Sequence, residues 1–365
     1  MKKKKTQRHW SDYLWLLLIA IVVFFTPNAI AYVKLNYFSS LLEMRELASI
    51  DIASDIPISA FAMPGGIACC SDDQLNVYSY DGKLNYQRQL FGKRTIVRVA
   101  GDHIVVVDLA RGEIAKLSLS LELVDKKRNI GQIVDVLTTD QGDVICQMSA
   151  DNAIRVFDAN LDEKALITVP TDRVIEIMLS ADQSTILVST VAIEELVFKS
   201  YVLQYDLQGR PTATGDLEGE LLFNAYLMDH QVLVTQSKIK SYNRESKKVA
   251  EILNIEKIDQ TAAHKHFLYT SYMAEEDGVE QPYLSIYSDD LSYRQQLKLA
   301  ALPEHIIVND KFIITYAEGT LYIYDHSLRS LKSLQTHRNI KGIQWLDASH
   351  LMAYDQSHIN VYVLD

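Results

Sequence analysis

Two pairs of residues in this sequence have the types and spacing to do chemistry. Cys69 and Cys70 are adjacent, as a vicinal disulfide requires, and His264 and His266 share a face if their segment is a strand. The cysteines lie in GGIACCS, which is typical of a buried strand, where a free cysteine behaves as a small apolar residue. Cys146, in VICQM, has similar neighbours. We therefore predict structural roles for the three cysteines. Two imidazoles are fewer than the three or four ligands of zinc, so we predict no metal site at His264 and His266.

Acidic residues gather in short polar turns. The clusters are Asp72 and Asp73, residues 140–143, residues 275–277, and Asp289 and Asp290. None has the ordered ligand spacing of a calcium-binding loop, so we interpret them as solvated hairpin tips. Other aspartates close apolar strands, a position from which the side chain caps a turn. These are Asp81, Asp158, Asp206 and Asp325.

Motifs of the common catalytic classes are missing from the sequence. It contains no G-x-S-x-G elbow, no G-x-x-x-x-G-K phosphate loop, no H-E-x-x-H and no G-x-G-x-x-G. We therefore predict no catalytic, cofactor-binding or metal-binding residue, and no cofactor. A site assembled from several distant repeats would leave no such local pattern.

The charge of the N-terminus differs from that of the remaining chain. The 365 residues have a formal net charge of −11, yet residues 1–33 hold Lys2 to Lys5 and Arg8 against a single acid, Asp12. The rest of the chain is therefore strongly acidic, which disfavours nucleic acid as a partner and favours basic ones. Three cysteines in a chain of this length do not form a disulfide framework.

The apolar segment 13–33 follows the basic cluster and carries no formal charge. At about 1.5 Å per residue it is long enough to cross a hydrocarbon core of about 30 Å. Tyr13, Leu14 and Trp15 begin this predicted membrane anchor and Val33 ends it, with the N-terminus inside the cell by the positive-inside rule. The alternative is a signal peptide cleaved after Ala31, which would release a secreted protein.

The anchor divides the sequence into four predicted parts. A short cytoplasmic tail (1–12) and the transmembrane signal-anchor helix (13–33) are followed by a stalk (34–46) and an extracytoplasmic domain (47–365). Apolar residues of the stalk recur at helical spacing, although an irregular linker fits the same residues.

From residue 47 the sequence repeats apolar strands and polar turns about every 40 residues. Eight strands mark the repeat: 75–81, 113–119, 154–158, 201–206, 239–243, 283–288, 321–325 and 359–365. Each follows a short apolar run, as expected of inner strands buried between neighbouring sheets, and turn residues interrupt any helical pattern. We predict an all-β, eight-bladed β-propeller, or a seven-bladed one if the weak unit 113–119 merges with a neighbour.

Residues 71–90 show the repeating unit most clearly. A strand through Leu75 and Val77 is followed by Asp81-Gly82 and by a returning strand through Leu84. An Asp-Gly pair between alternating runs predicts a hairpin with a type I′ turn, in which both central residues have positive φ.

The two ends of the repeat array complement each other. The chain stops directly after the third strand of the last unit, and the run 47–53 alternates with period two but belongs to no unit. We predict that this run supplies the missing outer strand and closes the ring, which removes an exposed sheet edge. The residues expected at the closure are Leu47, Ile50, Ile52, Ile359, Val361 and Val363.

Two units are longer than the others. Insertions at 191–199 and 274–281 fall between the second and third strands of their units, so both should lie on one face of the ring. Insertions confined to one face often mark a binding face, although simple drift in hairpin length also produces them.

The phrase LNVYSYDGKLNYQRQL, residues 75–90, resembles the repeat of quinoprotein-type (PQQ-like) propellers, with Tyr86 in place of the usual tryptophan. Catalytic members of that class place a vicinal disulfide over their cofactor, but the remaining ligands of such a site are not recognisable here. The order of tail, apolar span, stalk and degenerate repeats also resembles an uncharacterised family of membrane-anchored β-propeller proteins of Gram-positive bacteria, notably over 129–165 and 174–206. This resemblance implies the organisation of the chain and no catalytic residue.

This organisation is compatible with three functions. The first is a non-enzymatic propeller on the outer side of the cell membrane that binds envelope proteins or a cell-wall polymer. The second is a lyase, glycosidase or quinone-dependent dehydrogenase with its site at the central channel, and the third is a ligand-sensing ectodomain. Inward carboxylates, arginines or histidines with shifted pKa values would favour the enzyme, whereas a bland channel would favour the scaffold.

Overall fold

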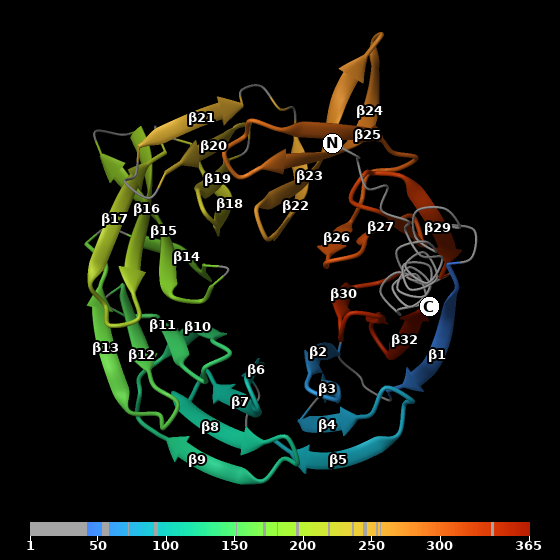
Figure 1. Cartoon of the computed structure of the whole chain (residues 1–365). Helices are drawn as coiled ribbons and strands as arrows, with labels where there is room; N and C mark the ends of the chain where they lie inside the picture. Colours follow the sequence, from blue (N-terminus) through green and yellow to red (C-terminus); the bar gives the residue numbers. More distant parts are fainter. Residues whose placement is uncertain are drawn as a thin grey trace, which may run out of the picture.

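Figure 1 shows a computed structural model of the chain, in which the strands form a ring of sheets. The described residues are 42–52, 58–71, 73–90, 94–150, 152–170, 173–180, 182–194, 197–217, 220–235, 237–243, 247–252, 255, 257–336 and 339–365. The predicted tail and anchor, and most of the predicted stalk, lie outside these residues. Within them, no helix has the length and apolar character that crossing a bilayer requires.

The described residues form 32 strands in eight antiparallel sheets of four. Each sheet is one blade, and its first strand lies nearest the axis of the ring (Figure 1). Blades 1 to 4 are β2 (Ser59–Met63), β3 (Gly66–Ser71), β4 (Gln74–Tyr78), β5 (Leu84–Gln89); β6 (Thr95–Ala100), β7 (His103–Asp108), β8 (Glu113–Ser118), β9 (Leu123–Lys127); β10 (Ile133–Thr138), β11 (Val144–Met148), β12 (Ala153–Phe157), β13 (Glu163–Thr168); and β14 (Arg173–Leu179), β15 (Thr185–Glu194), β16 (Val197–Asp206), β17 (Pro211–Asp216).

The other four blades follow in the same order. Blades 5 to 8 are β18 (Leu222–Leu227), β19 (Gln231–Thr235), β20 (Ile239–Tyr242), β21 (Lys248–Ile252); β22 (Ile258–His264), β23 (Phe267–Glu276), β24 (Val279–Ser288), β25 (Arg294–Lys298); β26 (His305–Val308), β27 (Ile313–Ala317), β28 (Thr320–Tyr324), β29 (Ser330–Gln335); and β30 (Gly342–Trp345), β31 (His350–Tyr354), β32 (His358–Leu364), β1 (Met44–Asp51). The eight-bladed prediction is confirmed. The seven-bladed alternative is wrong, because the weak unit 113–119 forms β8 in a blade of its own.

Burial explains why the second strands are continuous apolar runs. All five residues of β11 are buried, whereas most of β13, on the outer edge of the same blade, is exposed. A strand near the middle of a blade is covered on both faces by the neighbouring blades, so both of its alternating faces must be apolar. The core therefore lies between blades: Val107 of β7 and Val136 of β10 share one apolar cluster with Phe157 of β12.

The N-terminal strand β1 pairs antiparallel with β32 and is the fourth strand of blade 8. Ile50 lies opposite Ile359 and Ala48 opposite Val361, and the pairing begins at Met44, opposite Leu364. Residues 44–46, which the sequence assigns to the stalk, therefore belong to the closing strand. The register shifts between Glu46 and Ala48, because Leu47 is an extra residue without a partner on β32 and its side chain is 38% exposed.

The turn at Asp81-Gly82 is not of type I′. Gly82 has a φ of 83°, but Asp81 is not among the residues with positive φ. The backbone N–H of Gly82 donates to the carbonyl of Ser79, and a bulge follows at the start of β5. This hairpin therefore matches the right-handed twist of its strands with one left-handed residue and a bulge, in place of the two left-handed residues of a type I′ turn.

Connections alternate between the two faces of the ring, because the strands of each blade are antiparallel. We call the face with the links between second and third strands the hairpin face, and the opposite one the turn face. The two insertions lengthen β15–β16 and β23–β24 into hairpins with ten residues in each strand, both on the hairpin face. The β23–β24 hairpin projects beyond the outline of the ring (Figure 1).

Candidate functional site

The innermost strands of blades 3 to 6 each contain one unpaired residue near the hairpin face. In β10, Ile133 pairs with Met148 and Asp135 with Gln147, so Val134 has no partner on the second strand. The register shifts in the same way in β14, β18 and β22. Inner strands β2, β6, β26 and β30 keep an unbroken register. Bulges re-aim side chains, so one side of the ring presents groups that the other side does not.

Each of the bulges in blades 3 to 5 presents an apolar residue followed by a polar one. We call these six residues the inner-rim cluster: Val134, Asp135, Ile175, Glu176, Phe223 and Asn224. Val134 is 49% exposed, Ile175 51% and Phe223 46%, although all three lie on the innermost strands of the ring. Solvent therefore reaches the inner rim at these three blades, and it meets apolar side chains there.

An ion pair joins the inner rims of blades 2 and 3. The guanidinium of Arg98, on β6, lies 3.6 Å from Asp135 Oδ1, and its Nε donates to the backbone carbonyl of Val136 at 3.2 Å. The Asp135 carboxylate also accepts a hydrogen bond of 2.8 Å from the Val136 N–H. Both side chains are about one third exposed, so solvent screens the pair and its main effect is to orient the Asp135 carboxylate.

Among the described residues of the inner-rim cluster, Glu176 is the carboxylate that no cation balances. It has no hydrogen-bond or ion-pair partner among the described residues. Partial burial raises the pKa of Glu176, and the negative charge of Asp135 raises it further. Burial also raises the pKa of Tyr226 to about 12, with a contribution from the charge of Glu176.

The polar groups of blade 5 are already occupied. The Asn224 amide donates to Thr261 Oγ1 at 3.0 Å, and its oxygen accepts from the Ala225 N–H at 3.0 Å. The Tyr226 hydroxyl is 2.7 Å from the same Thr261 oxygen, which joins blades 5 and 6. Within the inner-rim cluster, the Glu176 carboxylate is therefore the charged group that can still accept hydrogen bonds from a ligand.

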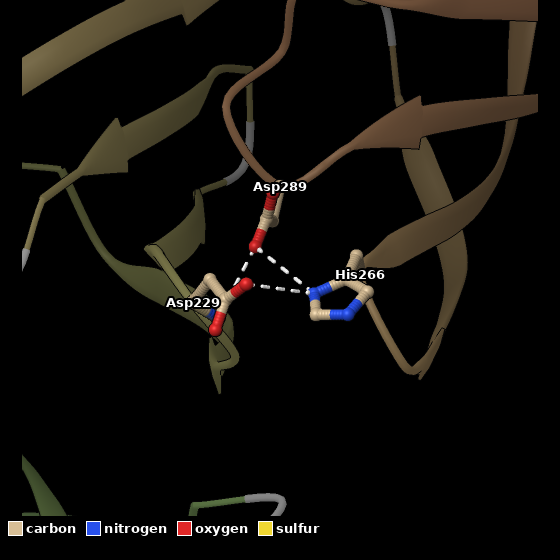
Figure 2. Close-up of side chains that lie close together, drawn as sticks. All are labelled: Asp229, His266 and Asp289. Carbon is tan, nitrogen blue, oxygen red and sulfur yellow. Dashed lines mark hydrogen bonds and ion pairs between the residues drawn. The ribbon is translucent and has the colours of Figure 1, made fainter.

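A second group of ionisable residues lies on the turn face, between blades 5 and 6. Asp229 follows β18, His266 lies in the turn between β22 and β23, and Asp289 follows β24. Figure 2 shows the three side chains pointing toward one another. His266 Nδ1 is 3.1 Å from Asp229 Oδ2 and 4.0 Å from Asp289 Oδ2. Ligand atoms of all three lie within 4.8 Å of one another, as a divalent cation would require.

Asp289 has a clear structural role in this group. Its Oδ2 accepts hydrogen bonds from the backbone N–H groups of Asp229 and His230, at 3.1 and 3.2 Å, across the boundary between blades. The hydroxyl of Ser241 donates to the Asp289 carbonyl at 2.6 Å. Both lone pairs of the carboxylate oxygen that faces His266 are thus used by backbone donors, so we interpret the group as an inter-blade latch.

The predicted histidine pair does not converge. Strand β22 ends at His264, and Lys265 has a φ of 54°, so the chain turns before it reaches His266. His264 Nε2 is 2.8 Å from Asp310 in blade 7, whereas His266 faces Asp229 in blade 5. A shared strand face is therefore wrong for these residues, and their carboxylate neighbours come from distant parts of the sequence.

The cysteines have structural surroundings. All three are free, and the adjacent Cys69 and Cys70 pack into different apolar clusters, on opposite faces of blade 1. Burial raises the pKa of Cys69 to about 12, with a smaller contribution from Cys70, and burial raises the pKa of Cys146 to about 12. Thiols of this kind are poor nucleophiles near neutral pH.

The strand-closing aspartates cap turns, with one exception. Asp158 Oδ1 accepts from the N–H groups of Asn160 and Asp162, at 2.8 and 2.9 Å, and Asp206 and Asp325 repeat this pattern. In blade 1 the residue directly after the third strand is Ser79, so Asp81 does not occupy the position of the other three aspartates. The Asp81 carboxylate instead accepts from Ser79 Oγ and the Lys83 N–H, inside the turn.

The fold places the chain among the eight-bladed β-propellers. It belongs to the family described as "Family of unknown function (DUF5711)", whose model matches residues 43–364. No protein of curated function matches the sequence.

Several solved structures share the fold at low sequence identity. BamB from Moraxella catarrhalis is 12% identical with a TM-score of 0.57, over 88% of this chain and 100% of that one. The C-terminal WD40 domain of Sif2 is 10% identical with a TM-score of 0.63, over 88% and 98%. Dihydro-heme d1 dehydrogenase NirN, in complex with DHE, is 15% identical with a TM-score of 0.56, over 76% and 66%. At these identities the likeness concerns the fold alone.

Proposed function

We propose that this protein is a propeller scaffold, held at the outer side of the cell membrane by residues 13–33, that binds other proteins of the cell envelope through its hairpin face. The observation that carries the proposal is that three consecutive blades expose apolar side chains at the inner rim of this face, and both long hairpins add one. Val134, Ile175 and Phe223 lie on its inner rim, and Ile193 and Val279, on the two long hairpins, are 59% and 55% exposed. Exposed apolar groups of this kind are typical of surfaces that bind proteins.

The likeness to BamB and to a WD40 domain is compatible with an interaction scaffold. A closed ring holds its faces rigid, so it presents a large surface without the entropic cost of ordering it at each binding event. The membrane position rests on the sequence of residues 13–33. Fusions at the C-terminus to alkaline phosphatase and to a fluorescent protein test it, since only the former is active outside. The mass of the mature N-terminus distinguishes an anchored chain from one that begins at Tyr32.

Site-specific photo-crosslinking in cells tests the scaffold function. Benzoylphenylalanine at Val279 or Phe223 samples the hairpin face, and the same probe at Tyr86, 47% exposed on β5, samples the outer edge of the ring. We expect discrete adducts with other envelope proteins from the hairpin face and none from Tyr86. Equal labelling at all three positions, or no adducts, would contradict the proposal.

One observation supports an enzyme as a second candidate function. Glu176 has a raised pKa and lies near the charge of Asp135, and a carboxyl group of this kind is suited to act as a general acid. Incubation of the full chain and its Glu176→Gln variant with purified cell-wall polymer distinguishes the two functions. Cleavage that the variant has lost supports the enzyme, whereas unchanged polymer with both proteins supports the scaffold.

A further inference from the structure

The inner-rim cluster has a composition that the fold itself does not require. Blades 1, 2, 7 and 8 close around the same axis without bulges in their inner strands. Blades 3 to 5 instead expose Val134, Ile175 and Phe223, each followed by a polar residue. Three neighbouring blades thus carry large apolar side chains in solvent, where each loses the favourable free energy of burial.

The polar half of the cluster has one unbalanced charge. Arg98 binds Asp135 and the Val136 carbonyl, and Asn224 is occupied by Thr261 and its own backbone. Of the two carboxylates in the cluster, only that of Glu176 has no partner among the described residues. The Glu176 side chain is exposed to solvent, so a cation that donates hydrogen bonds to its carboxylate can reach it.

We propose that the inner-rim cluster binds an extended segment of a partner protein, which places one Lys or Arg side chain against Glu176 and aliphatic side chains against Ile175 and Phe223. This inference rests on the proposed scaffold function and specifies its ligand. Charge complementarity selects the basic residue, because Glu176 offers one carboxylate and no cation. The neighbouring Ile175 and Phe223 favour aliphatic residues beside this basic residue, because exposed apolar side chains are stabilised by contact with other apolar groups.

The charge of the remaining chain agrees with a basic partner. The chain has a formal net charge of −11 even with the lysine-rich N-terminus included. Such a surface attracts cationic segments over a Debye length of about 8 Å at physiological salt, and the contact with Glu176 then fixes their position. Glu176 directly follows Ile175 in β14, and its charge acts on Tyr226 of blade 5, so the order of basic and aliphatic residues in the segment should affect binding.

A positional-scanning library of acetylated, amidated hexapeptides tests the proposal with the full chain. We expect selection of Lys or Arg at one position and of Leu, Ile or Val beside it. Glu176→Gln should reduce affinity for the selected peptide about tenfold and leave affinity for its acetyl-lysine version unchanged. Phe223→Ala should weaken both peptides equally, because it removes an apolar contact. Glu122→Gln, which removes an exposed acid between β8 and β9 on the turn face, is the matched control and should change neither.

Three results would overturn the proposal: no selection by the library, selection of acidic or uncharged residues in place of the cation, or a Lys preference that survives Glu176→Gln. The outcome is separable from that of the scaffold function. If crosslinking at Val279 captures envelope proteins while the library finds no basic segment, the scaffold holds and this inference fails. If no position of the hairpin face crosslinks to another protein, the scaffold function itself fails.

Discussion

The hydroxyl of Ser49 donates a 2.9 Å hydrogen bond to Asn360 Oδ1, although 311 residues separate the two in sequence. The bond links β1 to β32, and backbone bonds between Glu43 and Asp365 extend the same seam to the last residue. Closure at this seam covers the edge of β32, which would otherwise be free to pair with another chain.

Weakening the seam should therefore destabilise the whole ring. Ile50 is 6% exposed and packs beside Ile359, so Ile50→Ala should lower the free energy of unfolding by about 2 to 4 kcal/mol. Leu47→Ala is the matched control on the same strand, because Leu47 is exposed at the bulge, and its cost should stay below about 1 kcal/mol. Urea unfolding of the full chain measures both, and equal costs would contradict a closing role for β1.

The latch between blades 5 and 6 should depend on one carboxylate. Asp289→Ala leaves the N–H groups of Asp229 and His230 without their acceptor and should cost about 2 to 3 kcal/mol. Asp289→Asn keeps an acceptor oxygen and should cost less. His266→Ala should be close to neutral, because the His266 side chain is 61% exposed. A rise in melting temperature on addition of zinc, abolished by His266→Ala, would instead identify a metal site.

The cysteines should be unreactive in the folded protein. With pKa values of about 12, Cys69 and Cys146 are almost entirely protonated at pH 8, and their burial also excludes reagents. Iodoacetamide should label both residues only after denaturant is added, and mass spectrometry of tryptic peptides reads the labels out. The mass of the unlabelled chain should not change on reduction. A gain of two protons would show a disulfide and contradict this assignment.

The charge of Glu176 should make stability depend on pH. Because its pKa is raised in the folded state, folding favours the protonated form, and stability falls as pH rises through that pKa. Glu176→Gln should therefore stabilise the protein at pH 7, by less than about 1 kcal/mol because solvent screens the group, and the gain should vanish near pH 4. Asp135 and Tyr226 are unchanged in the variant. The same gain at both pH values in urea unfolding would show that burial and Asp135 do not act on this group.

Each aspartate that caps an outer turn should contribute on its own to the stability of the protein. Asp158→Ala removes the acceptor for the N–H groups of Asn160 and Asp162 and should cost about 1 kcal/mol. Asp158→Asn retains that acceptor and should cost a few tenths. Thermal unfolding compares the two variants, and an equal loss in both would point to the charge of Asp158 as the important property.

The blades could be predicted because each is a local pattern of about 40 residues. Alternation and turn residues indicate the third strands, and the second strands are recognisable as apolar runs such as β11. The type of turn at Gly82 could not be predicted in the same way. Asp-Gly is compatible with more than one turn geometry, and the twist of the folded blade selects among them.

The inner-rim cluster left only a weak signal in the sequence. Apolar–apolar–polar–apolar runs such as Ile133 to Val136 break the alternation of a strand, and the break marks the bulge. A one-residue shift of register reverses which side chains are buried, and the pairing with β11 decides it. Sequence alone therefore could not show that Val134 is exposed.

The sequence by itself determined that the chain forms a ring of seven or eight twisted sheets, since strand period, turns and core composition act over neighbouring residues, and the structure decided that there are eight. Only the tertiary structure decided which polar groups meet. Asp229, His266 and Asp289 come from separate turns of two blades, and Glu176 lies near the charge of Asp135 from the adjacent blade. The physical reason is that these distances depend on how rigid sheets pack around a common axis, which no local pattern encodes.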